Sequence, residues 1–373
     1  VALYASSFYS IIPLNVYYTR AFMPESMMLM SSVIGVYLFG EWLDKQRPLY
    51  FFLSAFFVAL AALLKIPTLY LGLPLSFLAW CKYQSRILKV PSLWIYALLI
   101  ILPVALWYYH AHEIYKNSGF SFGIWFFGTD KWGIGGPLLT LKFYNDVFFK
   151  SIAERHLTYA GFIPFVIGLL IKRQSSRERV FDWWLIALLA FFALVTIGNQ
   201  VHEYYQLPFV IPASVFVGKA FERYLSGLRS TGYWQNHKTL RVVLLLCVVA
   251  TPILSFLRVS NFMKGERIDG SVFHLASAVQ SRTQPTDLLI TVDEGNPVVL
   301  YRCNRKGWQS FPEMLTTEFL NDKYKSGAKY LAGEKEVFNT DERQTILKRI
   351  LSAYETVIDT PHFFLAKLDH KRQ

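Results

Sequence analysis

About nine apolar runs, separated by short polar segments, are the feature that most constrains how this chain folds. They lie at roughly 1–17, 26–43, 49–64, 66–81, 92–110, 157–171, 181–198, 207–221 and 241–257. A helix that crosses the hydrocarbon core needs about 20 predominantly apolar residues. The composition, 53% hydrophobic and 17% charged, is also poor in charge for a soluble domain. These observations predict a polytopic α-helical membrane protein with about nine spans. Several runs are short, and the pair at 49–81 also fits a broken or re-entrant element.

The distribution of positive charge orients these runs. The net charge is +12, and cations gather in the loops after the second, fourth, sixth and eighth runs. These cations are Lys45, Arg47, Lys82, Arg86, Lys89, Lys172, Arg173, Arg177, Arg179, Lys219, Arg223, Arg229, Lys238 and Arg241. The short turns after the first and third runs hold Arg20 and Lys65, and the turn after the seventh holds no cation. The positive-inside rule then places the cation-rich loops in the cytoplasm, and the high net charge does not require a nucleic-acid partner.

The composition changes near Arg258, where apolar runs shorten and charged and turn residues return. The pattern predicts two domains: 1–257 in the membrane, and an extracytoplasmic α/β domain over 258–373. In the second domain, segments near 287–292, 328–333, 355–359 and 362–368 have strand patterns. A turn and a short helix are predicted after the first of these strands, and further helices near 266–281 and 340–352. The aromatic, glycine-rich segment 111–156 is predicted to be an extracytoplasmic loop with a short amphipathic helix over 137–155.

The short stretch from Tyr17 to Glu25 contains the first candidate site residues. It places Arg20 and Glu25 between two apolar runs, where ionisable groups are costly unless they contact water or each other. Glu25 follows Pro24 and begins a run, so it can complement a helix dipole. It can equally serve as a general base or a metal ligand at the membrane surface. Arg20 can bind a substrate or simply anchor to lipid phosphates.

Lys65 interrupts the segment "ALLKIPTLYLGLP", which holds no other charge. An ammonium in such surroundings requires an anionic partner, and a lipid phosphate would serve. The alternative is a cation that snorkels to the membrane surface.

A second polar group begins the run at 207–221, where His202, Glu203, Tyr204 and Tyr205 stand together. These residues fit substrate binding, although they also fit an interfacial aromatic belt. As a metal site the group is weak evidence, because metal sites usually need three or more protein ligands. Glu154, Arg155 and His156 precede another run and are expected to be solvated. The sequence contains no phosphate-binding loop, dinucleotide fingerprint or zinc spacing.

The stretches "YYTRAFMPE", "ALLKIPTLYLGLP", "HEYYQLPFVIP" and "LYRCNRKGW" occur in an order that resembles the type C glycosyltransferases. The resemblance covers about residues 1–310. It is closest to the bacterial polyprenyl-phosphate-dependent branch, which includes protein mannosyltransferase-like enzymes and the aminoarabinose transferase of lipid A.

The resemblance implies transfer of a sugar from a polyprenyl-phosphate donor to a lipid, glycan or protein acceptor, with inversion, on the outer face of the inner membrane. It implies that Glu25 occupies an acidic position of the site and that Lys65 occupies a basic one. His202, Tyr204 and Tyr205 then match an outer substrate-binding stretch. A divalent metal ion is a possible cofactor.

The chain departs from the family at one point. Members carry an acidic residue, the usual candidate for the catalytic base, in a loop after the first span. No counterpart precedes Val1, so the chain is expected to be an N-terminally truncated member, and whether it is active alone stays open at this level.

Two other classes of function remain open at this level. A secondary transporter would place ionisable residues near the bilayer midplane, often in repeated halves, whereas here they cluster at one face and no repeat is found. A non-catalytic membrane scaffold predicts that Glu25, Lys65 and His202 do not converge.

Overall fold

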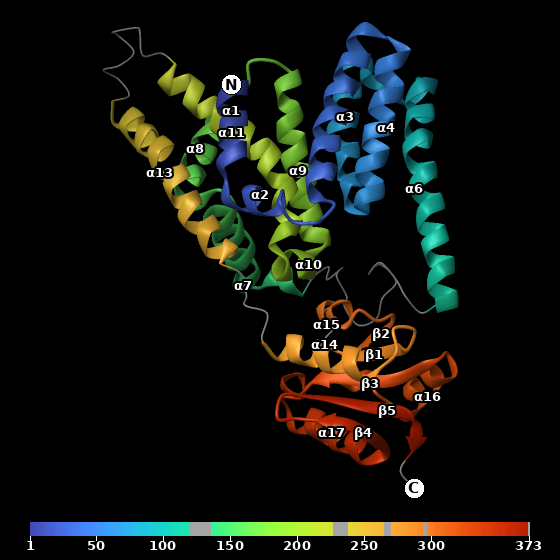
Figure 1. Cartoon of the computed structure of the whole chain (residues 1–373). Helices are drawn as coiled ribbons and strands as arrows, with labels where there is room; N and C mark the ends of the chain where they lie inside the picture. The colour runs from blue at the N-terminus through green and yellow to red at the C-terminus, as the bar shows by residue number, and fades with distance from the viewer. Residues whose placement is uncertain (119–135, 227–237, 265–269, 294–296, 372–373) are drawn as a thin grey trace. The chain divides into compact units, whose positions relative to one another are not determined.

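The computed structural model describes residues 1–118, 136–226, 238–264, 270–293 and 297–371 (Figure 1). The chain divides into two compact units, Val1–Gly265 and Glu266–Gln373. Residue 258, where the composition changes, still belongs to the last helix of the first unit, which continues to Met263.

All regular secondary structure in the described part of the first unit is helical. Its α-helices are α1 (Ala2–Ile11), α2 (Pro13–Tyr18), α3 (Glu25–Lys45), α4 (Pro48–Leu64), α5 (Gly72–Tyr83), α6 (Pro91–Ser118), α7 (Leu141–Tyr144), α8 (Thr158–Leu170), α9 (Val180–Leu194), α10 (Thr196–Val201), α11 (Val210–Leu225) and α13 (Lys238–Met263). Shorter 3₁₀ segments are η1 (Ile66–Leu71), η2 (Gln84–Lys89), η3 (Pro137–Leu139), η5 (Arg177–Arg179) and η6 (Glu203–Phe209), and η4 (Asn145–His156) is a π-helix.

Three described helices are long and apolar enough to cross a membrane, namely α3, α6 and α13. Two shorter apolar helices, α4 and α8, accompany them. The expected count of about nine spans is therefore not confirmed, because several expected spans are divided. Pro13 has no amide hydrogen to donate and separates α1 from α2, and the expected run at 66–81 is divided into η1 and α5.

The expected helix over 137–155 is present as α7 followed by η4. The part of the expected 111–156 loop at 119–135 lies outside the described residues.

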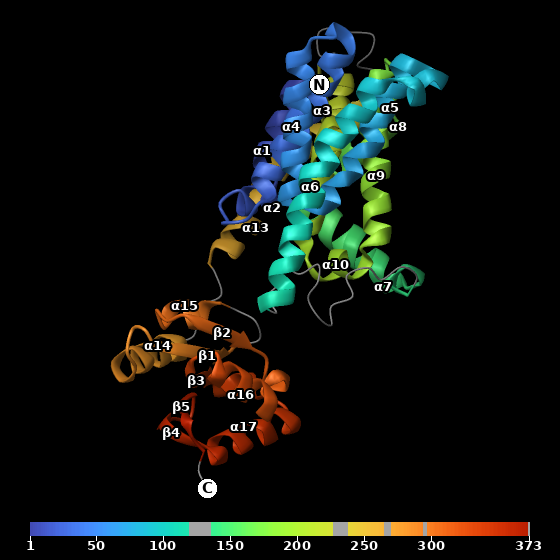
Figure 2. The same cartoon turned by 90° about the vertical axis from the view of Figure 1, so that its right-hand side faces the viewer.

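Helices α3, α4 and α6 pack side by side, as Figures 1 and 2 show from two directions. The hydroxyl group of Ser54 on α4 donates to the carbonyl of Gly35 on α3 at 2.7 Å and lies 2.7 Å from the Tyr96 hydroxyl on α6. The ring of Phe39 lies 4.8 Å from that of Tyr96. Because the two hydroxyls satisfy each other inside an apolar contact, they fix the register of the three helices.

Polar contacts gather at the two ends of the first unit. At one end lie ion pairs between Arg177 and Asp44 and between Lys219 and Glu178, and a hydrogen bond from Lys82 to the carbonyl of Leu43 at 2.6 Å. At the other end lie the contacts of Glu25, Lys65 and Glu203 described below. Helix α3 runs from one of these ends to the other, because it begins at Glu25 and holds Asp44 in its last turn. We call the end that contains Asp44, Arg177 and Lys219 the cation-rich end. The described cations that the sequence assigned to the cytoplasm lie there.

The second unit contains a five-stranded sheet. Its strands are β1 (Leu288–Val292), β2 (Gly307–Ser310), β3 (Ala328–Glu334), β4 (Tyr354–Asp359) and β5 (Phe363–Lys371), in the order β2-β1-β3-β5-β4. Its helices are α14 (Gly270–Arg282), α15 (Val298–Arg302), α16 (Thr317–Lys325) and α17 (Asp341–Ala353), with 3₁₀ turns η7 (Pro312–Met314) and η8 (Lys335–Val337). Strand β1 pairs in parallel with β2 and β3, whereas β5 pairs antiparallel with β3 and β4.

Alternating side chains of the sheet enter two separate cores. Leu289 and Ala332 pack with α14 and α15, whereas their neighbours Ile290 and Leu331 pack with α16 and α17. Successive side chains of a strand point to opposite faces, so a strand buried on both faces has a nearly continuous apolar sequence. The unit is thus a small α/β domain, as the sequence predicted, and the structure adds that helices cover both faces of its sheet (Figure 1).

Four strands and three helices of this unit match the sequence patterns, whereas β2 and α16 were not predicted. Strand β2 is short, and Gly307 opens it with φ +151°. A side chain at that position would overlap the carbonyl oxygen of Leu289 on the neighbouring strand. The glycine that permits the pairing also removes the apolar signal of a strand.

Candidate functional site

Glu25 and Lys65 form an ion pair between the start of α3 and the end of α4. Pro24 precedes Glu25, whose side chain is 1% exposed, while that of Lys65 is 22% exposed. Lys65 has an extended backbone, with φ −150° and ψ 111°, because a new 3₁₀ segment, with Pro67 in its first turn, begins at Ile66 directly after the helix ends. The break allows the side chain to reach α3, and the pair satisfies a carboxylate that would otherwise be buried without a counter-ion.

Two tyrosine rings from η6 lie against the same ammonium. Lys65 Nζ is 4.4 Å from the centroid of the Tyr204 ring and 4.8 Å from that of Tyr205. A cation at this distance from an aromatic face is attracted by about 0.5–2 kcal/mol, depending on how far it is desolvated. Lys65 is therefore held by one carboxylate and two aromatic faces.

His202 extends this group of rings. Its imidazole stacks on Tyr204 with centroids 5.1 Å apart and lies 5.9 Å from the Tyr205 ring. Tyr205 in turn stacks on Phe191 of α9 at 6.3 Å. The structure thus brings Glu25, Lys65, His202, Tyr204 and Tyr205 together, and we call these five residues the lysine cluster.

Glu203 points to the other side of η6. Its Oε1 accepts from the Tyr18 hydroxyl at 3.3 Å, and its Oε2 accepts from Arg155 Nη1 at 2.9 Å. Its backbone carbonyl lies 3.0 Å from His156 Nε2. Glu203 therefore joins η6 to α2 and to the π-helix η4, and it positions the tyrosines that follow it.

The sequence pattern did not indicate the roles of Tyr18, Arg155 and His156. The expectation that His156 is solvated was wrong, since the side chain is fully buried. Burial of the imidazole at the end of η4 lowers the pKa of His156 to about 4. The only available signal was weak: a Glu-Arg-His run that stands directly before an apolar stretch. Contacts between such distant segments are not visible in a pattern of composition.

Arg20 does not join the lysine cluster. Its guanidinium is exposed, and its Nη1 lies 3.7 Å from the sulfur of Met263 on α13. The segment between α2 and α3 carries the side chain away from Lys65, so proximity in sequence to Glu25 did not translate into proximity in space.

The phenols of the cluster are expected to stay protonated near neutral pH. Burial, the neighbouring Tyr205 and the Glu25 carboxylate together raise the pKa of Tyr204 to about 12. Burial and Glu25 likewise raise the pKa of Tyr205. Both phenols can therefore donate hydrogen bonds to an anion such as a phosphate oxygen.

The cluster does not fit a directly bound divalent metal ion. Glu25 already faces the Lys65 ammonium, and Glu203 is engaged by Tyr18 and Arg155. Among the described residues, no group of three or more His, Cys, Asp or Glu side chains converges. A divalent ion needs several anionic or neutral oxygen or nitrogen ligands. The divalent cofactor named from the sequence stays a prediction.

An apolar groove begins at the residue that follows Lys65. Its volume is about 430 Å³, and it lies between η1–α5 and α9. Its lining residues are Ile66, Pro67, Leu69, Tyr70, Leu73, Ala187, Ala190, Phe191, Leu194 and Val195. A cationic group at the end of an apolar groove suits a ligand with a charged head and a hydrocarbon tail.

The fold and the cluster define a membrane protein with a cation held at one end of a helical bundle. Residues 1–109 match the family model described as dolichyl-phosphate-mannose-protein mannosyltransferase, which supports a membrane glycosyltransferase of that type. The matched segment contains Glu25, Lys65 and the helices that present them. A comparison with curated proteins found no match.

Proposed function

We propose that the chain transfers a sugar from a polyprenyl-phosphate donor to a lipid, glycan or protein acceptor, and that the lysine cluster binds the donor phosphate. The observation that carries the proposal is the placement of Lys65, whose ammonium contacts one carboxylate and two phenol rings. The family match over 1–109 supports the reaction class.

Lys65 is proposed to stabilise the leaving group. When the glycosidic bond to the phosphate breaks, negative charge develops on the phosphate oxygens. The partly exposed ammonium can reach such a ligand, and its apolar surroundings strengthen the attraction. The Tyr204 and Tyr205 hydroxyls are proposed to donate hydrogen bonds to the same oxygens.

Glu25 is proposed as the acceptor of the proton. When a phosphate engages Lys65, the carboxylate loses part of its counter-ion and becomes more basic. The acceptor hydroxyl then gives its proton to Glu25 while its oxygen bonds to the anomeric carbon. The bond from that carbon to the phosphate oxygen breaks, and the phosphate leaves with the electron pair. Attack opposite to the leaving group inverts the anomeric centre.

The groove at Ile66 is proposed to hold the first isoprene units of the donor. It is almost wholly apolar and begins beside the cation, so a lipid phosphate bound at Lys65 would place its tail there.

The proposed orientation follows the positive-inside rule. The cation-rich end would lie in the cytoplasm, and the lysine cluster would face the outer side of the inner membrane, together with the second unit. A cell-envelope acceptor would then meet the donor outside the cytoplasm.

The decisive experiment measures transfer of labelled sugar from polyprenyl-phosphate-mannose in membranes that contain the protein. Glu25→Gln and Lys65→Ala are each expected to lower the rate by about 10²-fold or more, as for the loss of a group that stabilises transition-state charge. Glu41→Gln and Lys45→Ala are matched controls, because they break an ion pair at the opposite end of the same helix α3. Unchanged transfer in both cluster variants would refute the site.

A further inference from the structure

A second cavity, with both polar and apolar lining residues, lies at the cation-rich end, away from the lysine cluster. Its volume is about 750 Å³, and it lies between the ends of α8 and α11 and the start of α13. Its described lining residues are Ile167, Leu170, Ile171, Lys172, Arg173, Gln174, Arg223, Tyr224 and Leu240. The lining includes three cations, and none of these residues is acidic.

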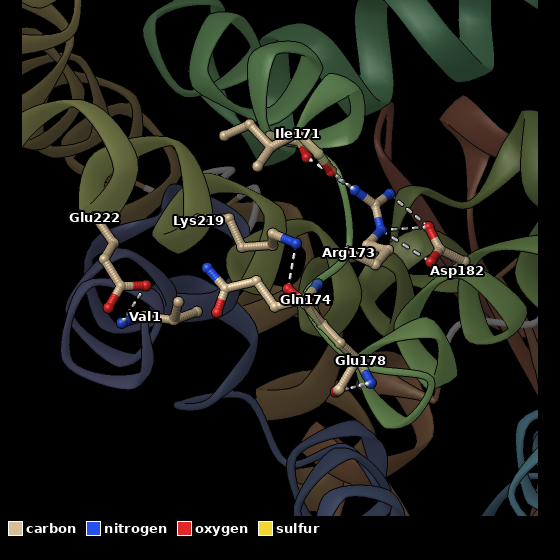
Figure 3. A network of polar contacts seen from close by, with 10 residues as sticks. Val1, Ile171, Arg173, Gln174, Glu178, Asp182, Lys219 and Glu222 are labelled. Carbon is tan, nitrogen blue, oxygen red and sulfur yellow. Dashed lines mark hydrogen bonds and ion pairs between the residues drawn. The ribbon is translucent and has the colours of Figure 1, made fainter.

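Arg173 is a structural clip rather than a ligand of this cavity. Figure 3 shows its guanidinium directed at Asp182, with Nε 3.0 and 2.9 Å from the two carboxylate oxygens. It also donates to the carbonyl of Gly168 at 3.3 Å, near the end of α8. On its other side, the guanidinium carbon lies 4.8 Å from the Phe216 ring centroid. These contacts fix the loop that carries Lys172 and Gln174.

The acidic side chains around the cavity are already engaged. Asp182 is neutralised by Arg173, and Glu178 pairs with Lys219, whose side chain is 4% exposed (Figure 3). Glu222, next to Arg223, faces Val1 instead. The potential in the cavity is therefore set by its cations. Lys172 is exposed and has no ion-pair partner among the residues that the structure describes.

The shape of the lining indicates an amphipathic ligand. Ile167, Leu170 and Leu240 provide apolar walls, while Lys172 and Arg223 approach from the ends of two different helices. The Gln174 amide and the Tyr224 hydroxyl add hydrogen-bond donors. Basic pockets between membrane helices, at the level where loops meet helix ends, suit the head groups of anionic lipids.

We propose that this cavity binds the phosphate group of an anionic phospholipid from the leaflet at the cation-rich end, with Lys172 and Arg223 as its ligands. The apolar walls assign the source of the phosphate to a lipid rather than to free inorganic phosphate. The site is separate from the lysine cluster, and its existence does not depend on the glycosyltransferase proposal.

The test is native mass spectrometry of the full chain, released from nanodiscs that contain phosphatidylcholine with or without phosphatidylglycerol. The wild type is expected to retain phosphatidylglycerol adducts in preference to phosphatidylcholine. The double variant Lys172→Gln/Arg223→Gln is expected to bind phosphatidylglycerol about tenfold more weakly, since each basic residue near an anionic surface contributes substantially to attraction. The single variant Lys172→Gln removes an exposed side chain, is expected to fold normally, and should weaken binding about threefold.

A matched control separates this pocket from general attraction to a charged surface. Arg86→Gln/Lys89→Gln removes the same charge from exposed positions in η2, in a loop of the cation-rich end that does not line the cavity. It is expected to leave the retained adducts unchanged. An equal loss in both double variants would overturn the proposal, as would equal retention of both lipids. A cavity that binds inorganic phosphate but not phosphatidylglycerol would overturn the assignment to a lipid.

Discussion

The Glu25 carboxylate is buried against the Lys65 ammonium, and this ion pair holds the start of α3 against the end of α4. The same ammonium also contacts two tyrosine rings. Removal of either charge therefore has consequences for stability as well as for transfer, and the two effects can be separated by experiment.

The ion pair predicts strong coupling between its two members. Glu25→Gln leaves the Lys65 cation in an apolar site, and Lys65→Met leaves a carboxylate that is 1% exposed without its counter-ion. The double variant removes both charges, so it is expected to be more stable than the sum of the single effects predicts, by about 2 kcal/mol. A double-mutant cycle of unfolding in SDS measures this coupling. Strictly additive effects would show that the pair contributes little.

The Tyr204 ring is predicted to act through its face as well as through its hydroxyl. Tyr204→Phe keeps the aromatic face 4.4 Å from Lys65 Nζ and removes only the hydroxyl, whereas Tyr204→Leu removes both. The leucine variant is expected to lose a further 0.5–2 kcal/mol or so of stability relative to phenylalanine. Unfolding in SDS measures the difference, and equal stabilities would contradict the cation–π contact. If the hydroxyl binds the donor phosphate, the phenylalanine variant should still show a raised KM for the donor.

Glu203 is predicted to position η6 through Tyr18 and Arg155. Arg155 is 43% exposed in its side chain, so Arg155→Gln is expected to change stability by less than about 1 kcal/mol. Glu203→Leu removes acceptors for both partners and should lower transfer more than Arg155→Gln does. Transfer rates of the two variants, normalised to folded protein, provide the comparison. A greater loss in Arg155→Gln would argue for a direct role of that cation.

Buried His156 predicts a loss of stability on acidification. Its pKa is lowered from 6.5 to about 4, so the unfolded chain takes up a proton first as the pH falls. Stabilisation by the neutral side chain is complete above about pH 6.5 and is lost as the pH falls towards 4, by about 3 kcal/mol in the limit. Thermal unfolding in detergent between pH 4.5 and 7 tests this. The variant His156→Gln, which keeps a donor for the Glu203 carbonyl, should show a flatter dependence, and parallel curves would contradict the prediction.

Helices α8 and α11 are predicted to require a glycine where they are in close contact. A Cβ on Gly168 would overlap the carbonyl oxygen of Phe216, a backbone atom that cannot rotate away. Gly168→Ala is therefore expected to destabilise the first unit by about 2–4 kcal/mol. Gly40→Ala is the matched control, because nothing lies within 4 Å of its Cβ position, and this change should be neutral or stabilising. Unfolding in SDS compares the two, and equal effects would contradict the close packing.

Apolar runs and the alternation of loop charge determined much of the fold in advance. The membrane class and the positions of most helices follow from the cost of placing polar groups in hydrocarbon, which is local to each segment. The strand patterns of the second unit were visible because β1 and β3 are buried on both faces and are therefore apolar over several successive residues. Lys65 and Glu25 were identifiable as candidates because isolated charges in apolar surroundings require partners.

Only the tertiary structure decided which of these groups meet. Lys65 pairs with Glu25 and contacts Tyr204 because the break after α4 and the start of α3 are packed at one end of the bundle, next to η6. Arg20, although closer in sequence to Glu25, lies elsewhere. The burial of His156 also depends on contacts between distant segments. A sequence records which residues must avoid hydrocarbon or find a partner, whereas the choice of partner depends on the packing of several helices at once.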